Sequence, residues 1–164
     1  MRRELVACAA MALLTLGGVN GCHRPSLGAR AGAQTPMDSV EGVVRAVGVQ
    51  GASNVVLATD DSAPSLRLSG APLLSRVAGL RVAVVGKRDG DHFTVSRFAV
   101  VAANGVRAAD GRLTAQGAGL MLVTPAGARY IVNGASPALR ANLGHRVWIA
   151  GLLDGQVVFY GVID

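Results

Sequence analysis

An internal repeat constrains the fold of this chain more than any other feature. Residues 69–90 (SGAPLLSRVAGLRVAVVGKRDG) align with residues 133–155 (NGASPALRANLGHRVWIAGLLDG) when one residue is inserted. The matched positions include Gly70 with Gly134, Gly79 with Gly144, Arg81 with Arg146, Val82 with Val147, Gly86 with Gly151, and Asp89-Gly90 with Asp154-Gly155. Weaker upstream matches are Gly42 with Gly111, Leu57 with Leu122, Leu66 with Tyr130, and Leu68 with Val132. Chance similarity in a chain rich in Ala, Gly and Val would not keep this ordered spacing, so we predict two copies of one small unit, at residues 40–103 and 109–164.

Each copy contains short Val-rich runs separated by turn residues, a pattern that is typical of strands. In the first copy we expect strands at 42–48, 54–59 and 65–69, a helix at 72–78, and strands at 80–87 and 92–102. In the second copy we expect strands at 111–117, 120–124 and 128–133, a helix at 136–142, and strands at 145–152 and 156–163. Residues Asn104 to Asp110 are expected to form a short link that brings the copies into contact, and the sequence leaves open whether they form separate barrels or share one core. The predicted class is all-β with short helices.

Several single residues refine this expectation. Asp89-Gly90 and Asp154-Gly155 predict tight hairpin turns, because Asp-Gly suits the positive φ angles of a type I′ turn. Gly86 and Gly151 fall inside predicted strands, where glycine is typical of a bulge or a sharp bend. Alternation in the fourth strand of the second copy points Val147 and Ile149 inward and Trp148 outward, or the reverse if a bulge intervenes. The predicted helices would plug one end of each unit with apolar side chains, namely Leu73, Leu74 and Val77 in the first copy and Leu139 and Leu143 in the second.

The order of three strands, a helix and two strands is similar to the OB-fold. The second copy carries the pattern Gly-x-Leu, Tyr-x-Val-x-Gly and Leu-Gly-His-x-Val-x-x-x-Gly, which resembles OB-like repeats of small bacterial exported proteins of unknown function. The residues that carry it are Gly111, Leu113, Tyr130, Val132, Gly134, Leu143, Gly144, His145, Val147 and Gly151. The first copy departs from the pattern at Leu66 and Leu80. The resemblance implies two tandem five-stranded OB-like barrels, each with one short helix between strands three and four.

The N-terminus has the organisation of an export signal. Two arginines precede an apolar run from Leu5 to Leu16, which is shorter than a membrane-spanning helix requires, and residues 1–21 are expected to be cleaved. The residues Val19, Asn20, Gly21 and Cys22 resemble the lipobox of bacterial lipoproteins, although Asn20 departs from the usual small residue. This resemblance implies that Cys22 receives lipid and anchors the chain; an ordinary secretory signal with an incidental cysteine is the alternative.

Residues 22–39 follow as a stretch rich in Gly, Ala, Pro and polar residues, which predicts a flexible tether. The expected location is therefore the periplasm or the cell surface, with the membrane contacted only through the lipid. Once residues 1–21 are removed, Cys22 is the single cysteine, so the monomer can form no disulfide. The net charge of +6 suits anionic partners, but the arginines are scattered and Lys87 is the only lysine, which is typical of a GC-rich genome.

Candidate catalytic and metal-binding groups are sparse. His23, His92 and His145 share no metal-ligand spacing, and no cysteine is free to join them. The acidic pairs Asp60-Asp61 and Asp89-x-Asp91 lack the further oxygens of a calcium loop and are expected to be solvated turn residues. We therefore expect neither an enzyme nor a bound cofactor or metal.

The remaining hypotheses are two kinds of binding protein. The first is a non-catalytic binding or adaptor module of the cell envelope that meets a protein, a glycan or an anionic polymer. The alternative is binding of single-stranded nucleic acid or oligosaccharide across the OB face of the second copy, by Arg129, Tyr130 and Trp148. Nucleic acid is disfavoured because aromatic residues make up only 4% of the chain and the corresponding strands of the first copy contain none.

Overall fold

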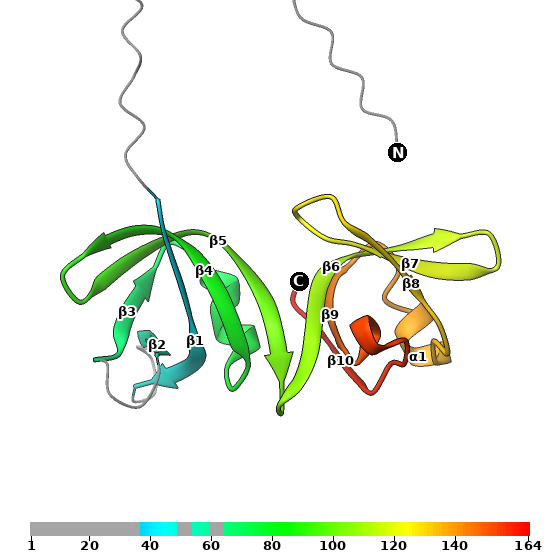
Figure 1. Ribbon diagram of the computed structural model, residues 1–164, viewed down its shortest axis with the longest axis horizontal. Coiled ribbons are helices and arrows are strands. Elements are labelled where there is room, and N and C mark those ends of the chain that lie inside the picture. The colour runs from blue at the N-terminus through cyan, green and yellow to red at the C-terminus, as the bar shows by residue number, and fades with distance from the viewer. Residues whose placement is uncertain (1–36, 49–53, 60–63) are drawn as a thin grey trace, which may run out of the picture. The chain divides into compact units, whose positions relative to one another are not determined.

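Strands carry most of the regular structure in the computed structural model of the chain, which describes residues 37–48, 54–59 and 64–164 (Figure 1). The first half comprises β1 (Asp38–Val47), β2 (Asn54–Ala58), β3 (Leu66–Ser69), the 3₁₀ helix η1 (Pro72–Val77), β4 (Arg81–Asp89) and β5 (His92–Ala103). The second half comprises β6 (Val106–Gln116), β7 (Gly119–Val123), β8 (Arg129–Val132), the helix α1 (Pro137–Arg140), β9 (Arg146–Ala150), the 3₁₀ helix η2 (Leu152–Asp154) and β10 (Phe159–Val162). The predicted all-β class with short helices is confirmed.

The strand pairing of the first half returns to the strand from which it starts. β1 pairs with β2, β2 with β3, β3 with β5, β5 with β4, and β4 with β1. All of these pairs are antiparallel except β3 with β5, which is parallel. The pair of β3 with β5 is the closing pair of the ring, and it is reinforced by the Arg67 N–H, which donates to the Asp91 carbonyl at 2.8 Å. Each of the five strands is therefore paired with a neighbour on both of its edges.

The second half repeats four of these five pairings, because β6, β7, β8, β9 and β10 pair as β1, β2, β3, β4 and β5 do, except that β8 and β10 are not paired with each other. Gly42 lies opposite Val82 in the first half, and Gly111 lies opposite Val147 in the second. In the same way, the pair of Leu57 and Leu66 corresponds to the pair of Leu122 and Tyr130. The second half lacks the closing pair, because β8 is paired only with β7 and β10 only with β9 among the described strands.

A tight hairpin joins the two halves into one ten-stranded sheet, so the expectation of two tandem barrels is corrected. Ala103 of β5 pairs with Val106 of β6, and Asn104 and Gly105 form the turn with φ angles of 49° and 77°. Positive φ at both positions is the signature of a type I′ turn. The predicted linker from Asn104 to Asp110 is therefore wrong, since β6 already begins at Val106 (Figure 1).

The other local predictions have mixed outcomes. The bulge at Gly86 is confirmed by a register shift between Val85 and Gly86, where a Cβ atom would lie 2.0 Å from the Thr94 carbonyl oxygen. Gly151 instead ends β9, with a φ of 81°, and η2 replaces the hairpin turn predicted at Asp154-Gly155. Strand β1 begins at Asp38, inside the stretch predicted as tether.

The hairpin at Asp89-Gly90 is present, but its two turn residues are Gly90 and Asp91. Asn104 is the only described residue other than glycine with positive φ, so Gly90, at 60°, has positive φ and Asp91 does not. That combination fits a type II′ turn rather than the predicted type I′ turn.

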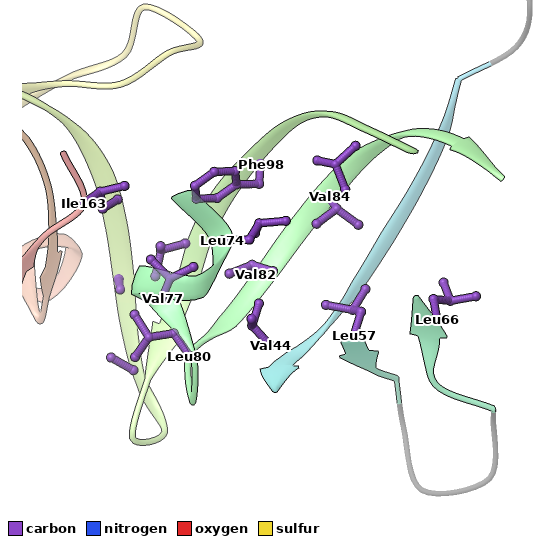
Figure 2. Close-up of a cluster of buried hydrophobic side chains, with 14 of the residues drawn as sticks. Val44, Leu57, Leu66, Leu74, Val77, Leu80, Val82, Val84, Phe98 and Ile163 are labelled. Carbon is purple, nitrogen blue, oxygen red and sulfur yellow. The ribbon is translucent and has the colours of Figure 1, made fainter. Parts of the chain in front are cut away.

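Two groups of buried side chains form the interior. The first core draws on the first half and on Ala108, Ala150 and Ile163 of the second (Figure 2). Its fully buried large side chains include Val44, Leu57, Leu66, Leu74, Val77, Val82, Phe93 and Ile163. The second core contains Ala109, Leu113, Leu120, Leu122, Val132, Leu139, Val147, Ile149 and Leu152. The first core is therefore built by residues of both halves.

The helices mostly bury the side chains that the sequence predicted. Leu74 and Val77 of η1 are buried, and so is Leu139 of α1, where the Ser136 hydroxyl caps the helix by accepting from the Leu139 N–H. Leu143 is 44% exposed, so its predicted plugging role is wrong. No helix in the described part of the chain is long and apolar enough to cross a membrane.

Candidate functional site

A buried carboxylate lies where the two halves meet. Asp110, on β6, is 2% exposed and is the only charged residue among the described residues that is buried. Its Oδ1 accepts a hydrogen bond from the Val100 N–H of β5 at 2.7 Å. Its Oδ2 accepts from Nε and Nη2 of Arg146, on β9, at 2.8 and 2.6 Å. A buried charge needs this degree of compensation, because an unpaired carboxylate in an apolar interior is strongly disfavoured.

Arg146 extends the same network to the first half. Its Nη2 also donates to the Phe98 carbonyl at 2.8 Å, and its guanidinium carbon lies 4.3 Å from the centroid of the Phe98 ring. Charge-assisted hydrogen bonds and a cation over an aromatic ring both favour one fixed geometry. Asp110 and Arg146 therefore fix β5, β6 and β9 relative to one another.

The first half places a similar pair in solvent. Glu41 and Arg81 occupy the positions that correspond to Asp110 and Arg146, and their side chains approach to 3.7 Å. Both side chains are about half exposed, at 53% and 43%. An exposed pair of this kind contributes little to stability. In the second half Asp110 is buried and the Arg146 side chain is only 21% exposed, because β5 contacts both of them.

An apolar groove of about 440 Å³ lies beside this network. Its lining from β4, β5 and β6 includes the small side chains Ala83, Ala99, Ala108 and Ala109. Its other side includes Pro125 and Ala126 of the β7–β8 loop, Tyr130 of β8 and Leu153 of η2. Alanines leave space on a sheet surface that larger side chains would fill, and the volume falls within the range of small-molecule sites.

Two polar groups in this groove are available to a ligand. Arg97 of β5 is exposed and has no ion pair or hydrogen bond with any residue that the structure describes. The Tyr130 side chain is half-buried, and its hydroxyl likewise lacks a described hydrogen-bond partner. The Asp110 carboxylate also lines the groove, but its oxygens are occupied by Val100 and Arg146. The groove therefore offers an apolar surface with one unpaired cation and one phenol.

A second hollow, which shares Thr124 and Pro125 with the groove, is less suited to binding. It is lined by Gly111, Arg112, Arg146, Asp164 and neighbouring residues. Its charged side chains already have partners, since Arg112 donates to the Gly144 carbonyl and Asp164 accepts from the Arg146 N–H. A ligand there would have to displace existing bonds.

The structure does not bring the three predicted ligand-binding residues together. Arg129 and Tyr130 are neighbours on β8 and so point to opposite faces of the strand. Trp148 of β9 points away from the second core, as predicted, but packs against the first core and across Gly161 instead of facing solvent. Of the three, only Tyr130 lines the groove. The predicted lipidation site Cys22, with the signal and most of the tether, lies outside the described residues.

No sequence pattern points to Arg97, Asp110 or the groove. The sequence predicts Asp110 as the last residue of a linker, and its partner Arg146 appears there only as a repeat position. Within the described residues, no group of three or more His, Cys, Asp or Glu side chains is placed to hold a metal ion. No protein-family model, curated protein or solved structure matches the chain.

Proposed function

We propose that the chain is a lipid-anchored, non-catalytic binding module of the bacterial cell envelope. The anchoring rests on the signal-like residues 1–21 and on the resemblance of residues 19–22 to a lipobox. The binding role rests on one observation, the apolar groove at the junction of the two halves with its unpaired Arg97. The ligand it suits has an apolar body and an anionic group.

The fold proposed for this module is a pair of OB-like units related by duplication and fused edge to edge. The matching registers of β1, β2, β3 and β4 with β6, β7, β8 and β9 support the duplication. The cyclic pairing of β1, β2, β3, β5 and β4, with a helix between β3 and β4, supports the OB-like relationship. The groove arises from the fusion, because neither unit alone supplies both of its sides.

The anionic fluorophore anilinonaphthalene sulfonate is a suitable probe of the groove, because it combines aromatic rings with one sulfonate. We expect it to bind residues 23–164, and Arg97→Gln to weaken binding about tenfold by removing one charge-assisted contact. Ala99→Leu should weaken it by filling the groove. Arg76→Gln is the matched control, since Arg76 is an exposed arginine on η1 away from the groove. Equal affinity of the wild-type protein and both groove variants would exclude the groove as the site.

The anchoring is tested separately, by following the chain in a bacterium that processes lipoproteins. We expect the wild-type chain to incorporate labelled palmitate and to sediment with membranes, and Cys22→Ser to lose the label. Mass spectrometry should find acyl chains on an N-terminal Cys22. An unmodified full-length precursor in the cytosol would contradict this part of the proposal.

The alternative of single-stranded nucleic acid or oligosaccharide binding keeps a distinct test. It requires Arg129, Tyr130 and Trp148 to act together, and no observation specifically favours that combination. Salt-sensitive retention on single-stranded DNA that is lost on Arg129→Ala would favour it over the groove.

A further inference from the structure

The outer edge of β8 is an unpaired strand edge. Thr124 N–H donates to the Ala128 carbonyl at 2.9 Å, which fixes the alternation of bonds along the β7–β8 ladder. Given this alternation, the backbone N–H and C=O groups of Tyr130 and Val132 form hydrogen bonds with β7, whereas those of Arg129 and Ile131 point away from β7. Among the described residues, no other strand pairs with β8.

The first half shows what occupies the corresponding edge there. Arg67 is the counterpart of Ile131, and its N–H donates to Asp91, at the start of the segment that closes the ring. Ile131 has no such acceptor within the described residues. η2 packs near β8, but none of its described backbone groups bonds to the strand. The free edge of β8 at Ile131 therefore corresponds to the edge of β3 at Arg67, which β5 occupies in the first half.

The side chains of this edge favour association. Ile131 is 66% exposed, the largest exposed fraction among the large apolar residues described. Natural sheets usually protect such an edge with lysine, proline, a bulge or a covering element. β8 has the sequence Arg-Tyr-Ile-Val, with β-branched residues that favour strands and neither lysine nor proline.

We propose that β8 pairs antiparallel with β8 of a second copy of this chain, with Ile131 on the twofold axis. In this register the two Ile131 residues exchange backbone bonds and cover each other's exposed side chains. Arg129 then lies opposite Asn133 of the other copy, so no like charges face each other. An identical strand is the occupant that the edge suits, because each copy supplies the donor and the acceptor that the other lacks.

Cysteine cross-linking tests this register in the full chain. Directly opposed residues in a hydrogen-bonded antiparallel pair have Cα atoms about 5.5 Å apart, a distance that a disulfide can span. We expect Ile131→Cys to give a disulfide-linked dimer when membranes are oxidised with copper phenanthroline. Arg129→Cys is the matched control, because it lies on the same strand and the same face. In the proposed register the Arg129 residues of the two copies are far from each other, so this variant should give only the wild-type background.

A second variant removes the edge donor without touching the β7–β8 ladder. Ile131→Pro deletes an N–H that points outward, and an edge strand tolerates proline at such a position. Native mass spectrometry of the detergent-solubilised full chain should find dimers for the wild type and monomers for this variant. If the variant fails to fold by circular dichroism, the cross-linking result decides.

Three results would overturn the proposal. They are a monomeric wild-type chain, equal cross-linking of the two cysteine variants, and cross-linking of Ile131→Cys to a protein of different mass. None of these measurements depends on what the groove binds, so failure of the β8 pairing and failure of the groove are separately visible.

Discussion

Asp110 shows how one side chain can tie two repeated units together. The corresponding carboxylate of the first half, Glu41, meets Arg81 in solvent, where the pair is weakly held. In the second half a shorter carboxylate at the same position is covered by β5, and its two oxygens satisfy a backbone N–H and a guanidinium. The same pair of residue types therefore has a structural role in only one copy.

We predict that Asp110→Ala destabilises the protein far more than Glu41→Ala. Loss of Asp110 leaves Arg146 and the Val100 N–H without their partner and should cost about 3 kcal/mol. Loss of Glu41 should cost less than about 1 kcal/mol, because that pair is exposed. Urea unfolding of residues 23–164 measures both values. Similar losses for the two variants would show that the buried network contributes no more than a surface pair.

At this scale, prediction from sequence succeeds where a residue acts through its neighbours in the chain. Gly86 bends its own strand, and the helix predicted at 136–142 contains α1 (Pro137–Arg140), so local pattern is sufficient for both. Asp110 and Arg146 are 36 residues apart, and Arg97 gains importance only from a groove built by both halves. No local pattern carries that information, so these residues were missed.

At the scale of elements, the β5–β6 hairpin decides how the two units are joined. Asn-Gly between two strand-forming runs is the strongest short-range hairpin signal, and Asn104-Gly105 stands at the start of the stretch that the sequence analysis predicts as a linker. Residues Val106 to Asp110 carry no alternating apolar pattern, yet they extend β6. The sequence predicts the regularly alternating strands to within a few residues. The last strand is predicted at 156–163, but β10 covers only Phe159–Val162 because η2 precedes it.

The turn gives a prediction about the hairpin. Asn104 has a φ of 49°, a conformation that asparagine tolerates and that a β-branched residue resists. Asn104→Val should therefore destabilise the protein by about 1–2 kcal/mol, and Asn104→Gly should change stability by less than about 0.5 kcal/mol. Thermal unfolding followed by circular dichroism distinguishes the two variants. A stable Asn104→Val protein would mean that the turn does not hold the hairpin in this form.

For the molecule as a whole, the decisive feature is that the first core is built by both halves. Ala108, Ala150 and Ile163 of the second half belong to it, and Trp148 packs against it. Figure 2 shows Ile163 among the side chains of this core. A protein with two independent units would keep each core within its own repeat. The sequence predicts the repeated unit but leaves open whether the two copies share a core, because the repeat pattern describes what the copies have in common and the shared core depends on where they differ.

This arrangement predicts that residues 23–164 unfold in a single cooperative transition. Separating the halves would expose the side chains of the second half that fill the first core and would break the bonds of Arg146 to Phe98 and Asp110, so a state with one half folded is disfavoured. Trp148 is the only tryptophan of the chain and contacts the first core from β9, so its fluorescence reports on the junction. Its transition in urea should coincide with that of the far-ultraviolet circular dichroism, which reports on all strands.

In Asp110→Ala the fluorescence transition should move to lower urea than the circular dichroism transition, because the junction is weakened first. Two separated transitions in the wild-type protein would show that the halves are energetically independent despite the sheet that joins them.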